Sequence, residues 1–598
     1  MYTVKIGDGD VHDFIEDIGK IYEFINTELD SKIKLEFIKN CKKKFNMGKN
    51  QEFAGYYYKL KNVNKAKGVI YTPCEISRYM IKNLVKPIDV IENPFLKIVD
   101  PSCGCGNLIF SCFHYLRNIF VNNLESINKY NNIDLKIEDI NKHIVYNNLF
   151  GFDIDETAIK ILKIDLFNFS GVVSSKNFAV KDFLVECIDE KFDIFIGNPP
   201  YIGHKQIDRN YCQNLKGIYG SIYGDKGDVS YCFFKKALDC LKEMGKLGFI
   251  TSRYFCEAYS GKDLRKFLIE NSSIYKIVDF YGIRPFKNVG VDPMIIFLIK
   301  RRNFQNNVEI IRPKKNIQME KKEFYDSLFV KKDGDYRHFF MDQNFMGSSG
   351  WIFIDKTERS IIDKIRRKSE HTLEDICESH QGLITGCDRA FIVDESVLRG
   401  KNIESALIRP WIKSSCIHRN KVVHSGKFII YSNFIEDEAD YPNSIEYIGS
   451  YKKKLLNRRE CRRGFRKWYE LQWGRKPEIF EGKKIVFPYK SKDNRFAIDE
   501  GSYFSADVYS LVLKKDVDMT YSDLLKILNS PLYEFYFKTF GKKLGENLYE
   551  YYPNNLMRLK IPLIDFFEVN DVEGYLYRFF ELTKEEIKIV RQSYYVDE

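Results

Sequence analysis

The sequence predicts an α/β fold with a doubly wound, mostly parallel sheet, preceded by a small helical arm and followed by an α+β domain. Between about residues 68 and 300, short apolar runs alternate with amphipathic segments such as 155–169, which is typical of a parallel sheet covered by helices on both faces. The chain has 598 residues, more than one hydrophobic core of ~250–300 residues accommodates. The runs that we expect to form strands are 96–100, 148–154, 177–180, 192–198, 245–252, 274–280 and 293–300.

Three regions follow from the change of pattern along the chain. Apolar residues recur at helical spacing from about 12 to 60, so residues 1–64 are predicted to be a helical arm, in which we see no chemistry. Residues 65–305 contain the alternating strands and helices, and residues 306–598 hold mixed short runs that end in a helical tail from 571 to 595.

The bulk composition is that of an ordinary globular protein, with 44% hydrophobic and 30% charged residues. A formal net charge of +11 weakly favours a polyanionic partner. The 14 cysteines form no paired CxxC motifs, and we find no signal peptide and no apolar run of membrane-spanning length. We therefore expect a cytoplasmic monomer that binds neither metal nor membrane.

A glycine-containing loop follows the first predicted strand. The strand ends at Asp100, and the loop that includes Ser102, Gly104 and Gly106 leads into a helix. Glycine lets a backbone turn tightly and approach a ligand, but a loop of this kind is weak evidence alone.

Acidic residues end the next two predicted strands. Asp153 lies about 50 residues downstream, where a carboxylate can accept both ribose hydroxyls of an adenosyl group. After the third strand, Asp182 could accept a hydrogen bond from the adenine amine, and Phe183 could pack on the ring. Upstream, Thr72 or Pro73 is predicted to start a helix.

The most specific motif is Asn198-Pro199-Pro200-Tyr201, directly after the strand 192–198. Two prolines prevent further strand pairing and make the turn rigid. The side-chain oxygen of Asn198 and the carbonyl of Pro199 could both accept from an exocyclic amine, and Tyr201 could supply a ring face for a base.

In this order, VDPSCGCGN, GFDID, KDF and GNPPY resemble the motifs of N6-adenine DNA methyltransferases, and YTPCEISRYM resembles the N-terminal cofactor motif of that family. A recognition region placed last resembles the gamma class, specifically the relatives of type IIG restriction–modification enzymes, over roughly residues 65–565. The resemblance implies a Rossmann-like methyltransferase sheet that binds S-adenosylmethionine and double-stranded DNA.

Carried over to this chain, the resemblance implies a set of site residues. The cofactor would contact Thr72, Pro73, Asp100, Ser102, Gly104, Asp153, Ile154, Asp182, Phe183 and Asn198. The target adenine would be held by Asn198, Pro199, Pro200 and Tyr201, with Phe286 as the second ring of a sandwich. Cys103 and Cys105 depart from the small residues common in the family's first loop and could alter its packing or redox sensitivity.

The third region contains a strongly basic segment. Residues 451–478 hold 11 Lys or Arg against three Glu, with Trp468, Tyr469 and Trp473 among them. Basic groups neutralise phosphates, and aromatic rings can stack on bases, so we expect DNA contacts here and in the basic stretch 540–555. The predicted DNA-binding residues are Arg389, Arg463, Arg466, Lys467, Trp473, Arg475, Lys490 and Lys542.

These observations predict a bacterial enzyme that methylates N6 of an adenine flipped out of duplex DNA, and the short arm predicts that it carries no nuclease. Two alternatives stay open. The same NPPY chemistry is used on RNA and on protein glutamine, although such enzymes are typically shorter and lack a large basic C-terminal region. A non-catalytic DNA-specificity protein is the other, and the intact motif from Asn198 to Tyr201 argues against it.

Overall fold

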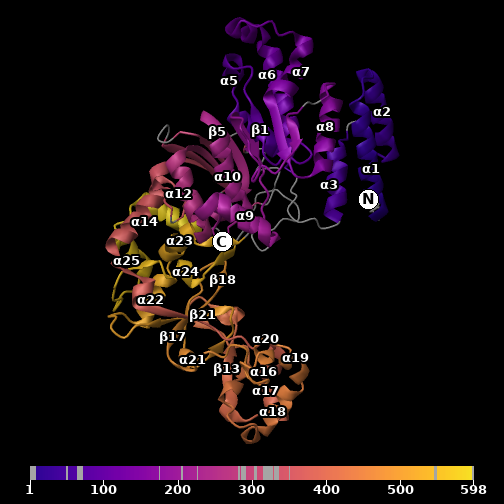
Figure 1. The fold of residues 1–598 in the computed structure, drawn as a ribbon. Coiled ribbons are helices and arrows are strands. Elements are labelled where there is room, and N and C mark those ends of the chain that lie inside the picture. The colour runs from indigo at the N-terminus through magenta and orange to yellow at the C-terminus, as the bar shows by residue number, and fades with distance from the viewer. Residues whose placement is uncertain are drawn as a thin grey trace. The chain divides into compact units, whose positions relative to one another are not determined.

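The computed structural model describes residues 8–48, 51–63, 72–173, 176–203, 206–224, 227–280, 283, 291–301, 306–313, 328, 336–348, 350–544 and 548–594. The chain forms two compact units, Met1–Phe353 and Ile354–Glu598, which are coloured from indigo to magenta and from orange to yellow in Figure 1. None of the described helices combines the length and apolar character needed to cross a membrane.

A nine-stranded sheet in the order β3-β2-β1-β4-β5-β7-β6-β8-β9 forms the centre of the first unit. The five strands from β3 to β5 are parallel, and β7 then runs antiparallel to both β5 and β6. Each strand predicted from the sequence is present, so the doubly wound, mostly parallel fold is confirmed. The strands are β1 Ile98–Asp100, β2 Leu149–Asp153, β3 Phe178–Val180, β4 Phe192–Gly197, β5 Leu241–Ser252, β6 Ser273–Asp279, β7 Pro293–Ile299, β8 Asn307–Pro313 and β9 Tyr336–Asp342.

Helices cover both faces of this sheet (Figure 1). Alternate strand residues enter different cores: Ile98 packs in one, and its neighbour Val99 packs in the other. Helices α4, α5, α6 and α8 contribute to the first core, and α9 to α12 contribute to the second. These helices are α4 Cys74–Leu84, α5 Pro87–Glu92, α6 Asn107–Asn131, α8 Glu156–Ser170, α9 Arg209–Tyr219, α10 Val229–Cys240, α11 Tyr254–Glu257 and α12 Lys262–Asn271, and the short α7 Ile140–His143 precedes β2.

The helical arm is present as α1 Asp8–Ile25, α2 Ser31–Lys44 and α3 Phe53–Val63. It packs on the side of α8 that faces away from the sheet, where Ile161, Ile164 and Phe167 join the core of the arm. Asp165 of α8 accepts hydrogen bonds from the backbone amides of Phe53 and Ala54 and so caps the N-terminus of α3. The arm is therefore joined to the sheet through α8.

The boundary between the two compact units lies after Phe353, later in the chain than the predicted boundary at residue 305. Strand β8 pairs in parallel with β6, and β9 pairs antiparallel with β8, so both strands extend the sheet of the first unit. Residues just beyond 305 therefore belong to the first core rather than to the second domain.

The second unit combines small, mostly antiparallel sheets with short helices, as expected for an α+β domain; β13 and β20 form a parallel pair. One four-stranded sheet has the order β11-β21-β17-β19 and the other has the order β12-β16-β13-β20. Its strands are β10 His371–Thr372, β11 Cys377–Gln381, β12 Ile392–Asp394, β13 Ile408–Ile412, β14 Ile417–His418, β15 Lys421–Val422, β16 Lys427–Ile430, β17 Lys484–Pro488, β18 Lys490–Ser491, β19 Ala497–Asp499, β20 Tyr503–Phe504, β21 Val508–Leu513, β22 Lys542–Leu544, β23 Leu548–Glu550 and β24 Lys560–Ile561. Its helices are α14 Lys356–Lys368, α15 Leu373–Ile376, α16 Asp388–Phe391, α17 Glu395–Gly400, α18 Pro442–Gly449, α19 Lys452–Leu456, α20 Arg459–Arg462, α21 Glu478–Glu481, α22 Tyr521–Leu528, α23 Pro531–Phe540, α24 Pro553–Leu556, α25 Val572–Phe579 and α26 Lys584–Tyr594.

Candidate active site and nucleic-acid interface

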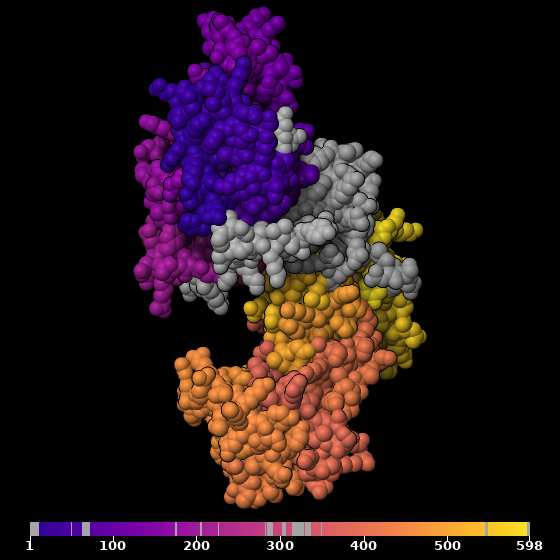
Figure 2. Space-filling view, turned by 90° about the vertical axis from the view of Figure 1, so that its right-hand side faces the viewer, coloured from indigo at the N-terminus to yellow at the C-terminus, as the bar shows by residue number. Residues whose placement is uncertain are grey.

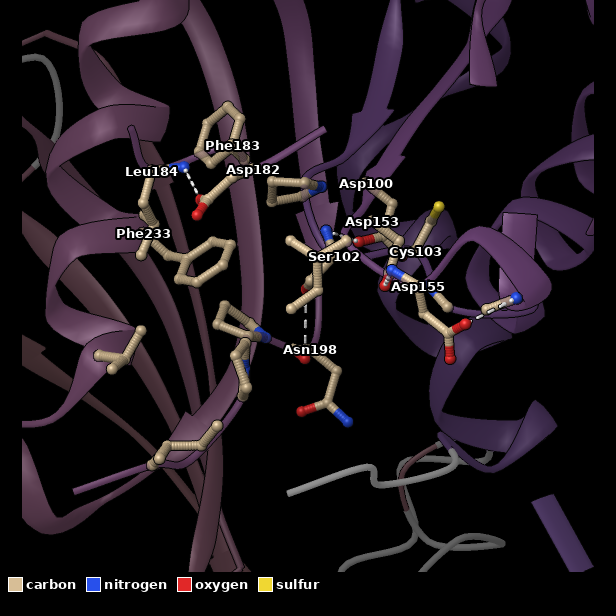
Figure 3. Close-up of a pocket in the computed structure, with 18 of the residues that line it drawn as sticks. Asp100, Ser102, Cys103, Asp153, Asp155, Asp182, Phe183, Leu184, Asn198 and Phe233 are labelled. Atoms are coloured by element: carbon tan, nitrogen blue, oxygen red, sulfur yellow. Dashed lines mark hydrogen bonds between the residues drawn. The ribbon is translucent and has the colours of Figure 1, made fainter. Parts of the chain in front are cut away.

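A pocket of about 550 Å³ lies at the carboxyl ends of β1 to β4, where ligands bind in open α/β sheets. Figure 3 shows Phe183 and Phe233 on one side of it, Asp153 and Asp155 on the other, and Ser102 and Asn198 between them. Most of the predicted cofactor and catalytic residues line this pocket: Thr72, Asp100, Ser102, Gly104, Asp153, Ile154, Asp182, Phe183, Asn198, Pro199 and Pro200.

The loop after β1 forms the floor of the pocket. The fully buried Asp100 accepts a hydrogen bond from the amide of Ser102, at 3.0 Å, and burial raises the pKa of this carboxyl to about 8. Gly104 and Gly106 both adopt the left-handed conformation, with φ of +50° and +92°, which favours glycine. The predicted tight turn is therefore present.

Asp153 connects the first two loops of the pocket. One carboxylate oxygen accepts from the amide of Gly104 at 2.8 Å, and the other accepts from the amide of Asp155 at 2.9 Å. Burial raises the pKa of Asp153, whereas these two backbone hydrogen bonds lower it. The carboxylate is held in one orientation at the end of β2, and its second lone pairs can accept further donors.

The third strand ends where the pocket is lined by a carboxylate and by aromatic rings. Asp182 accepts from the amide of Leu184 at 2.9 Å and from the hydroxyl of Tyr211 at 2.9 Å. The buried ring of Phe183 stacks on Phe233, with centroids 5.8 Å apart. Tyr211 and Phe233 come from α9 and α10, about 30 to 50 residues downstream, and no local motif predicted them.

Asn198 follows β4 and lies within a hydrogen-bonded group. Its side-chain nitrogen donates to the hydroxyl of Thr72 at 3.1 Å, which joins the segment before α4 to the NPPY motif. Its side-chain oxygen accepts from the hydroxyl of Tyr201 at 2.6 Å. The backbone carbonyl of Asn198 also accepts from Ser102 Oγ at 3.5 Å, so this loop contacts the first one.

Some predicted residues are placed differently from the rest. Pro73 is the N-cap of α4 and is not among the residues that line the pocket. The ring of Tyr201 packs against the core of the first unit, and its hydroxyl also donates to the carbonyl of Ile250, so the structure does not bring its ring into the pocket lining. Phe286 lies outside the described residues. The proposed roles of Tyr201 and Phe286 in stacking stay predictions.

Three pocket residues come from the arm in which the sequence showed no chemistry. Tyr57, Tyr58 and Lys61 of α3 all line the pocket. The hydroxyl of Tyr58 accepts from the amide of Cys105 at 3.2 Å, and it would lie only 2.6 Å from a Cβ added at Gly104. One feature of the sequence could have indicated this packing. Apolar residues occur on more than one face of α8, so this helix needs packing partners on two sides.

Cys103 and Cys105 are buried in the same loop, and burial raises the pKa of both thiols well above the ordinary value. Because the thiolate is the reactive form, this environment disfavours redox chemistry at either sulfur. Their role in the described structure is packing: Cys103 lies against Gly151 of β2, and Cys105 lies in the core that joins α3 to α8.

The predicted DNA-binding residues lie on four parts of the second unit. Arg463, Arg466 and Lys467 share the loop after α20, while Trp473 and Arg475 lie beside the residues that follow β11. Lys490 and Lys542 face Glu550 from the two sides of β23, and Lys542 pairs with it at 3.1 Å. Arg389 is exposed on α16.

Most cations of the basic segment 451–478 reach solvent. The buried Arg458 is the exception, since its guanidinium donates to the carbonyls of Thr385, Trp468 and Glu470 and so supports the segment from inside. Arg466 pairs with Glu470 at 3.6 Å. Arg459, Arg462 and Arg463 are exposed and make no ion pair with a described residue.

Comparisons with known proteins match both units. Residues 147–286 match the family model of the Eco57I restriction-modification methylase, and residues 397–563 match that of the TaqI-like C-terminal specificity domain. The chain is 24% identical over 498 residues to the type II methyltransferase M.BstVI of Geobacillus stearothermophilus, covering 79% of this chain and 85% of the relative. It is 25% identical over 538 residues to the type II methyltransferase M.HindII of Haemophilus influenzae, covering 83% and 90%.

A solved structure shares the fold over most of the chain. The type IIL restriction-modification enzyme MmeI, solved in complex with DNA, superposes with a TM-score of 0.55 at 13% identity, covering 88% of this chain and 74% of that chain. The chain therefore carries an Eco57I-like restriction-modification methylase segment followed by a TaqI-like C-terminal specificity domain, and it is a homologue of type II methyltransferases.

Proposed function

We propose that this protein transfers a methyl group from S-adenosylmethionine to N6 of an adenine flipped out of double-stranded DNA. One observation carries the proposal: Asn198 and Pro199 line the same pocket as Asp100, Asp153 and Asp182. A pair of acceptors suited to an exocyclic amine thus lies beside carboxylates suited to an adenosyl group. The names of the relatives, which are type II methyltransferases, agree with this chemistry.

The pocket residues fit S-adenosylmethionine. A volume of about 550 Å³ is within the range of ~300–1,000 Å³ that small-molecule sites occupy. Asp153, fixed by two backbone donors, would accept the ribose hydroxyls, and Phe183 with Asp182 would hold the adenine ring and its amine. When bound, the cofactor supplies an electrophilic methyl group on a sulfonium.

The residues after β4 would act on the target amine. The side-chain oxygen of Asn198 and the carbonyl of Pro199 would accept its two hydrogens, which orients the nitrogen lone pair. In the described structure Tyr201 donates to that same oxygen of Asn198, which has a second lone pair for the substrate. Positioning of this kind needs neither a metal nor a general base, because the amine proton can leave after transfer.

The second unit would hold the DNA. The exposed arginines of the basic segment 451–478 can neutralise the phosphates of DNA. An adenine in a duplex must be flipped out before its amine can enter a pocket. A TaqI-like specificity domain matches residues 397–563, which contain this segment. We infer that this unit selects the target sequence. We also infer that the protein acts on the duplex as a monomer.

Transfer of a radiolabelled methyl group to duplex DNA, RNA and protein tests the proposal, with Asn198→Ala as the matched inactive variant. We expect label in DNA adenine at N6, and none above the variant's level in RNA or protein. Label only in RNA or in protein glutamine would establish one alternative. DNA binding with no transfer to any substrate would establish a non-catalytic specificity protein.

A further inference from the structure

Phe465 is 73% exposed at the tip of a basic loop in the second unit. It follows α20, in the orange part of the chain in Figure 2, and it makes no ring contact with another described residue. Single exposed apolar side chains are common on protein surfaces, so a role for this ring has to be argued from its surroundings.

The backbone holds this ring outward in a defined geometry. Gly464 is left-handed, with φ of +75°, its amide donates to the carbonyl of Cys461, and the amide of Phe465 donates to the carbonyl of Glu460. This is a Schellman ending, in which the residue at the position of Phe465 commonly packs on an apolar residue one turn back. That position is occupied by Glu460 here, so the ring has no local apolar partner.

Hydrogen bonds fix the base of the loop. Arg458 is 9% exposed, and its guanidinium donates to the carbonyls of Trp468 and Glu470, which close the loop on its other side. The sulfur of Cys461 is 3.7 Å from the carbonyl of Lys467. The ring is therefore presented by an anchored loop, which lowers the entropy cost of using it in binding.

The charged residues around Phe465 indicate which kind of partner its ring contacts. Phe465 is flanked by exposed Arg462, Arg463 and Lys467. Phe567 in the same unit is 78% exposed, yet Asp565 and Glu568 flank it and would repel a polyanion. Exposure therefore does not by itself identify a ring that binds DNA. Of these two phenylalanines, only Phe465 has basic surroundings that suit phosphates.

We propose that Phe465 is a wedge that inserts between base pairs of the bound duplex while its neighbouring cations contact the phosphates. Apolar side chains inserted in this way unstack a base step and kink the duplex. An unstacked base step lowers the cost of flipping a neighbouring base out of the duplex. Phe465 is therefore a positioning residue for the substrate, and this inference rests on the proposed function.

The test compares Phe465→Ala with Phe567→Ala, using a duplex whose site has been mapped by sequencing modified DNA. We expect Phe465→Ala to weaken specific binding about 5- to 50-fold, within the range expected for loss of one stacking contact, and to lower the fluorescence rise of 2-aminopurine at the target. Binding to a duplex without the site should change less than about twofold, with the same salt dependence, because phosphate contacts remain. Phe567→Ala should match the wild type throughout.

Two further measurements separate a wedge from a fold defect. Phe465→Leu keeps an apolar side chain that can enter a base step, so it should recover most of the binding. Placing the target adenine in a mismatch lowers the unstacking cost, and should reduce the difference between Phe465→Ala and the wild type.

Phe465→Ala that methylates and binds like Phe567→Ala, while the wild type methylates DNA, would overturn the wedge. A wild-type protein that neither binds nor methylates DNA would instead overturn the proposed function.

Discussion

The pocket at the ends of β1 to β4 and the basic segment 451–478 differ in what their charged groups contact. In the pocket, Asp100, Asp153 and Asp182 each accept backbone hydrogen bonds within the protein. In the basic segment, Arg462 and Arg463 are exposed and have no ion-pair partner among the described residues. The pocket is thus organised by folding itself, whereas the basic surface is available to an external anion. Single substitutions should therefore have large, specific effects in the pocket and small, graded effects on the surface.

The sharpest test of the pocket is Asn198→Ala. This change removes one of two acceptors for the target amine and should lower the methyl-transfer rate by about 10²-fold or more, comparable with loss of a positioned transition-state hydrogen bond. Single-turnover transfer to DNA measures it. Cofactor affinity, measured by calorimetry, should change much less and controls for folding. Wild-type turnover would exclude Asn198 from catalysis.

Asp153→Ala should act on cofactor binding rather than on the rate. We expect S-adenosylmethionine to bind ~1.5–3 kcal/mol more weakly, because two charge-assisted hydrogen bonds to the ribose are lost. Calorimetry measures the change. Asp193→Ala is the matched control, since Asp193 lies near the other end of β4 and pairs with Lys242. Equal affinities in the two variants would move the ribose contact elsewhere.

Tyr58→Phe tests whether the arm belongs to the pocket. Loss of the hydroxyl leaves the amide of Cys105 without its acceptor, and one net hydrogen bond is worth about 0.5–1.5 kcal/mol. We expect cofactor affinity to fall by roughly 2- to 10-fold. Tyr56→Phe on the same helix is the control, because Tyr56 packs on Phe14 and Phe45 and does not line the pocket. No difference between them would make the arm a purely structural element.

Arg463→Ala should have the smallest effect. One lost phosphate contact should weaken binding to any duplex by a few fold and reduce the slope of log affinity against log salt by about 0.9. Arg399→Ala is the control, since this exposed arginine of α17 pairs with Glu395. Affinity titrations over a range of salt distinguish them. A loss of sequence preference rather than of overall affinity would place Arg463 at a base edge.

The same contrast explains what could be predicted from the sequence. Strand ends such as Asp100, Asp153 and Asn198 follow buried apolar runs directly, and a parallel sheet brings such ends together, so local patterns were sufficient. Tyr58 and Tyr211 reach the pocket from helices distant in the chain, and their partners are a backbone amide and Asp182. No spacing rule encodes such contacts.

Two other features depended on tertiary pairing. Strands β8 and β9 join the first sheet through β6, although the alternation that identified the earlier strands had already weakened. The hydroxyl of Tyr201 bonds to Asn198 and to the carbonyl of Ile250, and these contacts depend on the neighbouring strand rather than on the motif. The role of its ring in stacking on a base stays a prediction.

Adenine-N6 methylation by this protein can be measured by nucleoside mass spectrometry and sequence mapping of DNA from a bacterial host that expresses the chain. A host without adenine methylation of its own, and the same host with Asn198→Ala, provide the background. We expect N6-methyladenine at one recurring sequence motif, present with the wild type and absent with the variant. Unmodified adenine in both, or methylation of another base by the wild type, would contradict it.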